Sequence, residues 1–341
     1  LLISIAAVGW LMMKSVTKMS VGFLAVVLLL GMLYFWLSDP GQENPANSEG
    51  QASRIQSTDV PSAYFERPSE TGRVVEVQYA SLDYTQDNPP EITKTAYVYL
   101  PAGYDEADAE KRYNILYLMH GWRMTAGDFF NYSDLVTILD NMHANGDIEP
   151  TIVVTPTFDA ENRSQDFSRS EDEIRHFHQD FRNNLVPYIE SNYPTYAEGI
   201  SEEAFRNSRA HRAFAGFSGG SVTTWSQFIH NLDYIRYFGP MSGDSWEIEV
   251  YGGRDNSVRT VDVLENAVRE SNLESDDYYI YAATGTEDFA NDLITTQVEE
   301  MRTRPSFTPD NLTMAINDGG VHDLVSVQEY LYNMLPLFFG K

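Results

Sequence analysis

The chain of 341 residues carries 23 Lys and Arg against 50 Asp and Glu, which gives a formal net charge of −27 at pH 7. An acidic excess of this size repels phosphate backbones, so the chain is not expected to bind nucleic acid. The hydrophobic content of 43% argues against a disordered chain, and the absence of cysteine excludes disulfides, thiolate metal sites and a cysteine nucleophile.

The first predicted element is a membrane-spanning helix over Val21–Leu37. These residues include no charged side chain, and at ~1.5 Å per residue they nearly cross a hydrocarbon core of ~30 Å. Lys14 and Lys18 precede the run and Asp39 follows it, which by the positive-inside rule places the rest of the chain outside the cell. We therefore expect residues 1–38 to be an uncleaved membrane anchor, with a cleaved signal peptide as the alternative.

A polar segment follows the apolar run. Residues 39–69 are rich in Ser, Asn, Gln, Gly, Pro and Glu, and such a composition buries too little apolar surface to offset the conformational entropy of folding. We expect this segment to be a flexible linker that holds the following domain away from the membrane.

From residue 70 to residue 341, short apolar runs alternate with segments of helical periodicity. The predicted strands are Arg73–Tyr79, Thr93–Leu100, Ile115–Met119, Thr151–Thr155, Ala213–Phe217, Tyr278–Ala283 and Leu312–Ile316. The predicted helices are Phe177–Tyr193, Ser221–Leu232 and Leu324–Leu337. This alternation predicts one α/β domain, with a mostly parallel central sheet and helices on both faces. In such sheets the ligand lies beyond the carboxyl ends of the strands, so catalytic residues are expected directly after each strand.

A serine between glycines follows one of these strands. Residues 216–220 (GFSGG) fit the G-x-S-x-G pattern of a nucleophile elbow, and they lie between a predicted strand and a predicted helix. The pattern needs glycines because the sharp turn from strand to helix crowds the backbone. We therefore predict Ser218 as the nucleophile of an α/β-hydrolase fold, whereas the pentapeptide alone would also fit a plain glycine turn.

A serine hydroxyl needs a positioned base, which in this fold follows the nucleophile in the chain. Only His230 and His322 do so. His230 lies in the helix that begins at the elbow, whereas His322 follows the last predicted strand, so we predict His322 as the base. The turn after the preceding strand contains Glu287 and Asp288. We predict Asp288 as the acid that orients the imidazole, with Glu287 as the alternative.

The remaining part of the predicted site is an oxyanion hole. One donor in this fold is the backbone N–H after the nucleophile, here that of Gly219, and the other comes from the loop after an early strand. That loop begins at His120, directly after the strand that ends at Met119. We predict Trp122 as the second donor, with Gly121 as the alternative, and a structural hydrogen-bonding role for His120.

With these motifs the sequence resembles carbohydrate esterase family one, the feruloyl and acetyl xylan esterases, within the esterase D-like α/β hydrolases. The resemblance covers about residues 73–340. It is carried by the segments Ala96–Gly121, Gly216–Ser221, Phe238–Gly243, Gly285–Asp288 and Gly319–Asp323. It implies a serine esterase, without metal or organic cofactor, that removes feruloyl or acetyl groups from plant cell-wall polysaccharide such as xylan.

Two positions depart from many relatives and bear on the shape of the acyl pocket. Residues 122–125 (WRMT) stand where relatives have a glycine-rich stretch, and Gly219 stands where many have Met. Both differences keep the backbone N–H groups that would form the oxyanion hole. Arg123 and Trp246 are candidate substrate contacts, whereas Trp225, on the buried face of its predicted helix, is expected in the core.

The sequence therefore predicts an exported, membrane-anchored serine esterase, secreted if the leader is cleaved, with acylated polysaccharide or oligosaccharide as its substrate. Three alternatives remain open at this point. They are an acyltransferase of the antigen 85 type, in which a sugar hydroxyl replaces water, a general small-ester hydrolase, and a non-catalytic binding module on the cell surface.

Overall fold

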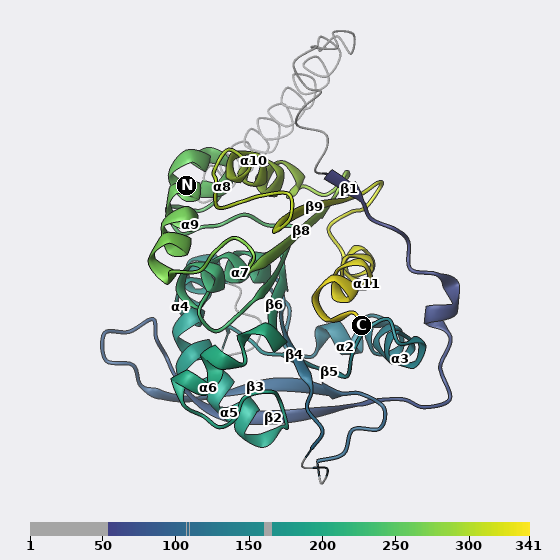
Figure 1. Ribbon diagram of the computed structural model, residues 1–341. Helices are drawn as coiled ribbons and strands as arrows, with labels where there is room; N and C mark the ends of the chain where they lie inside the picture. Colours follow the sequence, from purple (N-terminus) through teal and green to yellow (C-terminus); the bar gives the residue numbers. More distant parts are fainter. Residues whose placement is uncertain (1–53, 107, 109, 160–165) are drawn as a thin grey trace, which may run out of the picture. The chain divides into compact units, whose positions relative to one another are not determined.

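The computed structural model describes residues 54–341 except for residues 107, 109 and 160–165 (Figure 1). The predicted anchor of residues 1–38 therefore lies outside the described residues. Within the described part of the chain, no helix combines the length and the apolar character needed to cross a bilayer.

A nine-stranded sheet forms the centre of the domain, in the order β1-β9-β8-β7-β6-β4-β5-β3-β2 (Figure 1). The strands are β1 (Arg54–Gln56), β2 (Arg73–Leu82), β3 (Glu91–Leu100), β4 (Asn114–Met119), β5 (Thr151–Thr155), β6 (Arg212–Phe217), β7 (Tyr237–Met241), β8 (Tyr279–Gly285) and β9 (Leu312–Asn317). β3 pairs antiparallel with both β2 and β5, and the remaining neighbours are parallel. The fold is therefore α/β-hydrolase-like with a mostly parallel sheet, as the alternation of apolar runs predicts.

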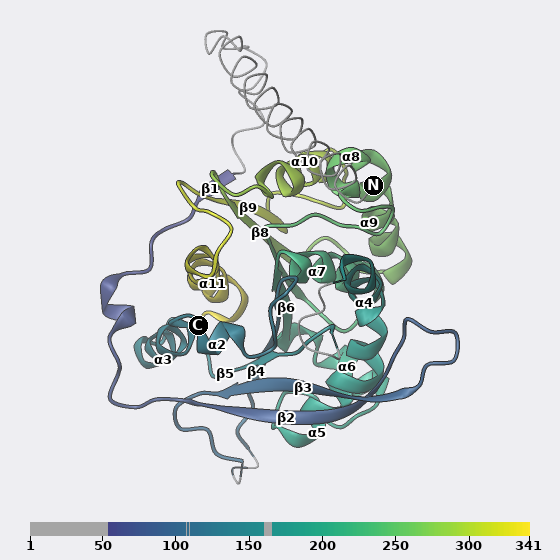
Figure 2. The same cartoon turned by 180° about the vertical axis from the view of Figure 1, so that it is seen from behind.

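Helices cover both faces of the sheet (Figure 2). One face carries α2 (Asp128–Asn131), α3 (Leu135–Asn145) and α11 (Leu324–Phe339). The other carries α4 (Phe167–Asp180), α5 (Val186–Asn192), α6 (Glu202–Asn207), α7 (Gly219–His230), α8 (Gly252–Asp255), α9 (Ser257–Ser271) and α10 (Asn291–Met301). Short 3₁₀ turns occupy Ser62–Phe65 and Arg209–His211.

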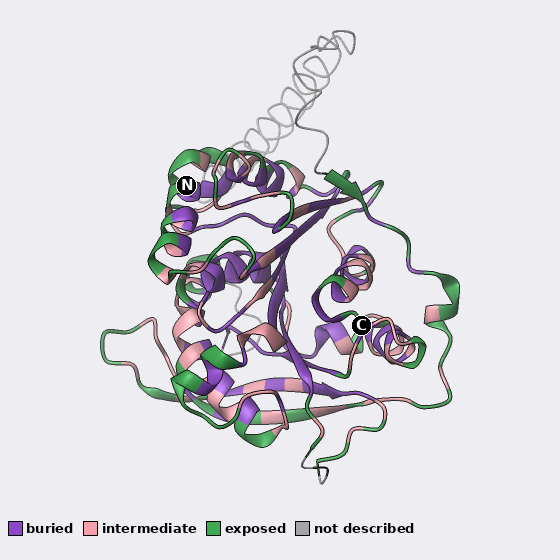
Figure 3. Cartoon of the chain, viewed as in Figure 1, coloured by how far each residue is buried: buried purple, intermediate pink, exposed green. Residues whose placement is uncertain are grey.

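The central strands are buried on both faces (Figure 3). Along β4, Ile115 and Tyr117 belong to the core that contains α4 and α7 residues, whereas Leu116 and Leu118 belong to the core that contains α3 and α11 residues. Successive side chains of a strand point to opposite faces. A strand covered on both sides therefore needs apolar residues at every position, which is why these segments are continuous apolar runs.

The helical segment that borders the site begins earlier than its predicted start at Phe177. α4 begins at Phe167, and the side chain of Asp166 caps it by accepting a hydrogen bond from the Ser168 N–H. The chain then passes through a π-helical turn over Phe181–Leu185 into α5. Pro187 has no N–H to donate to an earlier turn, which accounts for the change in winding there.

The expected linker over residues 39–69 differs from the structure in its second half. β1 adds to the sheet edge in parallel with β9, and the Thr58 hydroxyl donates to Asn333 at 2.7 Å. The Tyr64 ring packs edge-on against Tyr332, with centroids 5.0 Å apart. Composition does not reveal this docking, because main-chain pairing and a few ring contacts hold the segment in place. Residues 39–53 lie outside the described residues.

Candidate active site

Ser218 lies at the turn from β6 to α7 in a backbone conformation that non-glycine residues rarely adopt, with φ 57° and ψ −114°. A side chain at Gly216 would collide with the Gly220 carbonyl, and one at Gly220 would collide with the Met119 carbonyl. Close backbone approach therefore requires both glycines of the pattern. The turn also places Ser218 at the N-terminus of α7, where backbone N–H groups point toward a ligand.

His322 and Asp288 form a hydrogen-bonded pair that follows β9 and β8. His322 Nδ1 lies 2.8 Å from Asp288 Oδ1. Asp288 is buried, whereas the neighbouring Glu287 is exposed. The imidazole packs against the rings of Phe217 and Phe289, with centroids 4.4 and 4.1 Å away. Because Phe217 immediately precedes Ser218, this packing places the imidazole beside the elbow.

Asp288 is held in its ionised form. Burial acts to raise its pKa, but hydrogen bonds from His322 and from the Ala290 N–H outweigh burial and leave the pKa below its usual value. A carboxylate facing Nδ1 keeps the proton on that nitrogen and leaves Nε2 as the basic one. Among the described residues no hydrogen bond joins Ser218 to His322. Such bonds are often long in ligand-free proteins and tighten when substrate binds.

The backbone N–H groups of Gly219 and Trp122 are neighbours. A Cβ placed on Gly219 would lie 3.2 Å from the Trp122 nitrogen. His120 is buried beneath this loop, with Nδ1 2.8 Å from the Gly121 carbonyl oxygen and Nε2 2.8 Å from the Thr157 hydroxyl. Burial lowers the pKa of His120 to about 4, so the ring is neutral and donates from Nδ1 to Gly121. His120 therefore holds the loop in shape.

A cavity of about 190 Å³ opens beside Ser218 and is walled by aromatic rings. The ring of Phe167 lies between those of Trp122 and Trp246, with centroids 5.4 and 5.7 Å away. The rings that line the cavity are those of Trp122, Phe167, Trp246, Tyr251 and Phe289. Such a lining suits a flat or apolar group placed next to the serine.

The other candidates from the sequence fall in different places. Trp246 lines the cavity, and its Nε1 donates to Asp244 at 3.0 Å. Arg123 is exposed and does not line the cavity; its guanidinium lies 5.8 Å from the centre of the Trp122 ring. Trp225 is buried in the core, as expected. His230 stacks on His178 with ring centroids 4.0 Å apart, and it does not line the cavity.

Sequence reasoning missed three aromatic residues of the cavity, Phe167, Tyr251 and Phe289. Phe289 directly follows Asp288, so its position offered a signal that could have been used. Phe167 begins the amphipathic helix α4, ahead of the predicted helix start at Phe177, and Tyr251 directly precedes the short helix α8. Nothing in their spacing connects either residue to the motifs of the site. Among the described residues, no group of three His, Asp or Glu side chains is placed to hold a metal ion.

A mostly parallel sheet with a strained serine and a His–Asp pair at its carboxyl edge defines an α/β-hydrolase-like protein. The family model for putative esterases matches residues 91–331, and the chain belongs to this esterase family.

Four curated proteins match the sequence, and two of them are compared as follows. The chain is 36% identical over 309 residues to endo-1,4-beta-xylanase Y of Acetivibrio thermocellus, which covers 89% of this chain and 26% of that protein. It is 30% identical over 158 residues to an endo-1,4-beta-xylanase/feruloyl esterase of Xylanibacter ruminicola, covering 45% of this chain and 20% of that protein. The matches thus span about a quarter and a fifth of the length of these relatives.

Solved structures match the domain more completely. A serine-to-alanine mutant of the feruloyl esterase module from Clostridium thermocellum, complexed with sinapinate, is 36% identical with a TM-score of 0.72, over 84% of this chain and 94% of that one. A ferulic acid esterase from Anaeromyces mucronatus in complex with ferulic acid shares the fold, with a TM-score of 0.62 at 19% identity over 84% of this chain and 98% of that one.

Proposed function

We propose that this protein is a serine carboxylic-ester hydrolase that removes feruloyl or acetyl groups from plant cell-wall polysaccharide such as xylan. The observation that carries the proposal is the hydrogen bond between the buried Asp288 and the half-buried His322, beside a strained Ser218 that lines an aromatic cavity. The match over nearly the whole domain to a module named as a feruloyl esterase supports it.

The reaction proceeds in two displacements. His322 Nε2 takes the proton of Ser218 Oγ while this oxygen attacks the ester carbonyl, and Asp288 stabilises the imidazolium that forms. The C–O bond to the sugar then breaks, and the imidazolium returns its proton to the departing sugar oxygen. Water, deprotonated by His322, attacks the acyl-enzyme and releases the acid and the free serine.

The negative charge on the carbonyl oxygen is met by two backbone donors, the N–H groups of Gly219 and Trp122. Each donor of this kind is worth ~3 kcal/mol of the barrier. His120 contributes indirectly, because its hydrogen bonds to Gly121 and Thr157 fix the loop that presents the Trp122 N–H.

The cavity favours an aromatic acyl group over acetyl. A feruloyl ring has flat faces that pack offset or edge-on against aromatic walls, and such pairs contribute ~0.5–1.5 kcal/mol beyond the area they bury. An acetyl group would leave most of the 190 Å³ empty or wet. We therefore expect methyl ferulate to be a better substrate than a short acetyl ester.

The direct test compares the wild-type protein with Ser218→Ala on methyl ferulate, acetylated xylan and p-nitrophenyl acetate. We expect the variant to lose at least ~10³-fold in kcat. Ser226→Ala is a matched control, because Ser226 is also buried on α7 and does not line the cavity. Equal rates for wild type and Ser218→Ala would favour a non-catalytic binding module. Analysis of the products with a sugar acceptor present would reveal acyl transfer in place of hydrolysis.

We also propose, on the sequence alone, that the protein is exported and anchored through residues 21–37. Cells that express the full chain should carry esterase activity in the membrane fraction, and protease added to intact cells should remove it. Activity found in the medium would indicate a cleaved leader, and activity protected from protease would contradict export.

A further inference from the structure

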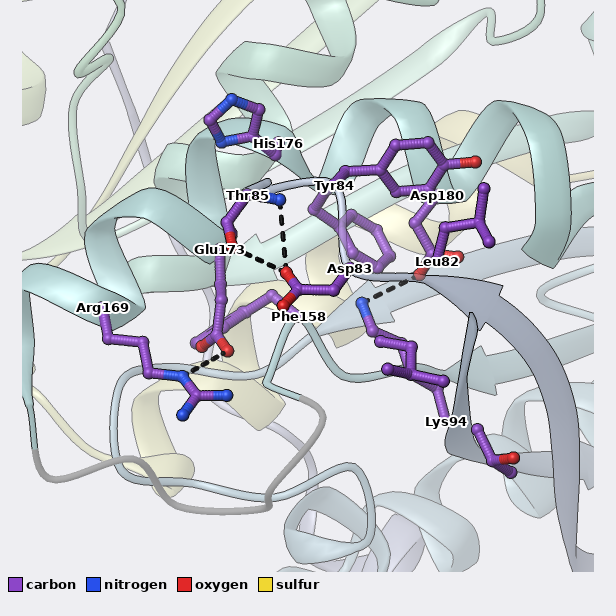
Figure 4. A pocket seen from close by; sticks show the side chains of 13 residues that line it. Leu82, Asp83, Tyr84, Thr85, Lys94, Phe158, Arg169, Glu173, His176 and Asp180 are labelled. Atoms are coloured by element: carbon purple, nitrogen blue, oxygen red, sulfur yellow. Dashed lines mark hydrogen bonds and ion pairs between the residues drawn. The ribbon is translucent and has the colours of Figure 1, made fainter. Parts of the chain in front are cut away.

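A second cavity, of about 390 Å³, lies between the β2–β3 hairpin and α4 (Figure 4). α4 borders both cavities: Ser170 and Ile174 line the one beside Ser218, whereas Arg169 and Glu173 line the second. We call the second cavity the hairpin pocket. Its lining includes Leu82, Asp83, Tyr84, Ile92, Lys94, Phe158, Arg169, Glu173 and Asp180. The proposed reaction uses none of these residues.

The strand register places the hairpin pocket at the same edge of the sheet as Ser218. β3 runs antiparallel to β5 with Tyr97 opposite Thr155, so the start of β3 extends beyond the carboxyl end of β5. Ser218 and Trp122 follow the carboxyl ends of β6 and β4. β6, β4, β5 and β3 are consecutive in the sheet, so three strand spacings of ~4.8 Å put about 14 Å across the sheet between β6 and β3. Along the strand direction, Ile92 of the pocket lies about 17 Å beyond the position opposite Thr155.

One acceptor in the hairpin pocket has no partner. Glu173 Oε1 accepts a hydrogen bond from Arg169 Nε at 3.1 Å, whereas Glu173 Oε2 is buried without one. The Glu173 side chain is only 8% exposed. Burial, together with the charge of Asp159, raises the pKa of Glu173 to about 7. Once Glu173 is ionised, its buried Oε2 lacks a hydrogen bond that a ligand with a donor group can supply.

The charges around the pocket disfavour an anionic ligand. Three carboxylates, those of Asp83, Glu173 and Asp180, line it with two cations. Lys94 Nζ lies 3.0 Å from Asp180 Oδ2, so its charge is already neutralised by the protein. Arg169 is likewise hydrogen-bonded to Glu173. Phosphate or a free phenolic acid would meet net repulsion here, whereas a neutral molecule with several hydroxyl groups would not.

The rest of the lining suits the same kind of molecule. Leu82, Tyr84 and Ile92 are each partly exposed at the pocket and offer apolar surface. Apolar surface beside a few fixed polar groups is the usual composition of a small-molecule site. A sugar ring can place its C–H groups against the apolar surface and its hydroxyl groups against the polar side chains.

We propose that the hairpin pocket binds a neutral sugar unit of the glycan chain whose ester is cleaved at Ser218, a few units away from the esterified sugar. This inference rests on the proposed function and deepens it. A sugar hydroxyl donates to Glu173 Oε2, and the chain crosses the N-terminal part of α4 to reach the serine. The enzyme should accordingly prefer an ester carried on an oligosaccharide to a small alkyl ester.

The test uses Glu173→Gln in the full chain, assayed at pH 8, where Glu173 is ionised. The amide keeps an oxygen for Arg169 but replaces the unpartnered acceptor by a donor. For a feruloylated xylo-oligosaccharide we expect kcat/KM to fall about tenfold, mainly through KM, because a hydrogen bond to a charged group is lost. For methyl ferulate, which does not reach the pocket, we expect less than about a twofold change.

Glu265→Gln is the matched control. Glu265 is also a buried glutamate that pairs with an arginine four residues away through one oxygen, and its other oxygen is also without a partner. It lies on α9 and lines neither cavity, so its replacement should leave both substrates unaffected.

Calorimetry with an unesterified xylo-oligosaccharide separates this inference from the proposed function. Wild type should bind the sugar about tenfold more tightly than Glu173→Gln. Equal losses on both esters, or no loss on either, would overturn the role of the pocket while leaving the esterase intact. Tighter binding of an oligosaccharide bearing uronic acid would overturn the neutral-ligand assignment. If no ester were hydrolysed but Glu173-dependent sugar binding remained, the proposed function would fail and the pocket would stand.

Discussion

The two cavities on either side of α4 are built from opposite chemistry. The cavity beside Ser218 has an aromatic wall with few charges at its mouth, whereas the hairpin pocket is lined by three carboxylates, a lysine and an arginine. The same polar helix, α4, supplies residues to both cavities. Under the two proposals, the cavity beside Ser218 recognises the acyl group, and the hairpin pocket recognises the sugar chain to which that group is attached.

The largest expected effect concerns the aromatic side of this comparison. Asp288→Asn keeps the shape of the pair but offers Nδ1 an amide in place of a carboxylate, and we expect kcat to fall by ~10³–10⁴-fold. Sugar binding in the hairpin pocket should not change, which calorimetry with a xylo-oligosaccharide would measure. Glu287→Gln is the matched control because Glu287 is exposed. Equal losses from both variants would show that the wrong carboxylate has been assigned.

The second-largest effect concerns Glu173 in the hairpin pocket and is a change in the free energy of unfolding with pH. The pKa of Glu173 is raised to about 7 by burial and by Asp159, so the folded protein binds this proton more tightly than the unfolded chain does. The stabilising contribution is therefore complete below the unfolded pKa of ~4.3 and is lost as pH rises through about 7, by up to about 4 kcal/mol.

Urea unfolding of the wild type and of Glu173→Gln at pH 5 and pH 8 measures this contribution. The free energy of unfolding of the wild type, relative to that of the variant, should be lower at pH 8 than at pH 5. A constant difference between the two proteins would mean that Glu173 does not titrate in this range.

A smaller effect tests whether the aromatic wall of the cavity beside Ser218 recognises the acyl group. Phe167→Ala removes the ring between Trp122 and Trp246, and we expect the preference for methyl ferulate over p-nitrophenyl acetate to fall about tenfold. Tyr132→Ala removes another exposed ring that does not line the cavity and should leave the ratio of the two kcat/KM values unchanged. An unchanged ratio in Phe167→Ala would exclude this ring from acyl recognition.

The smallest effect concerns the start of the helix that divides the two cavities. Asp166→Ala removes the side-chain acceptor that caps α4, and we expect a loss of ~1 kcal/mol in the free energy of unfolding. Asp166→Asn, which can still accept the bond, should restore most of it. Thermal unfolding of the three proteins would decide this, and identical stabilities would mean that the cap contributes nothing.

The parts of the molecule that could be predicted are those with local causes. The elbow requires glycines within five residues, and the buried strands require continuous apolar runs, so both are visible in the sequence. The strand β7 was not predicted because Gly239 and Pro240 interrupt its pattern. A side chain at Gly239 would lie 2.9 Å from the Ala215 Cβ on the neighbouring strand β6 and would displace the end of the Met334 side chain on α11. Both are contacts between distant parts of the chain.

In the candidate site, too, features with local causes could be predicted, whereas contacts between distant parts of the chain could not. The motifs that contain Ser218, Asp288 and His322 each follow a strand, so topology alone predicts that they meet. The aromatic wall draws rings from segments as far apart as Trp122 and Phe289, and no spacing rule connects them. The hairpin pocket draws Leu82, Ile92 and Arg169 from the ends of β2 and β3 and from the first turn of α4, which lie beyond the predicted bounds of these elements.

The strained backbone of Ser218 has a consequence for the stability of the protein. Holding a residue with a side chain at this φ and ψ costs ~1–3 kcal/mol, which the rest of the domain must supply. Substitutions selected only for a higher melting temperature would therefore tend to remove this backbone strain. They would also move the Ser218 hydroxyl away from its position above the sheet. Stabilising substitutions should therefore be placed far from the elbow, for example where β1 (Arg54–Gln56) pairs with the edge of the sheet.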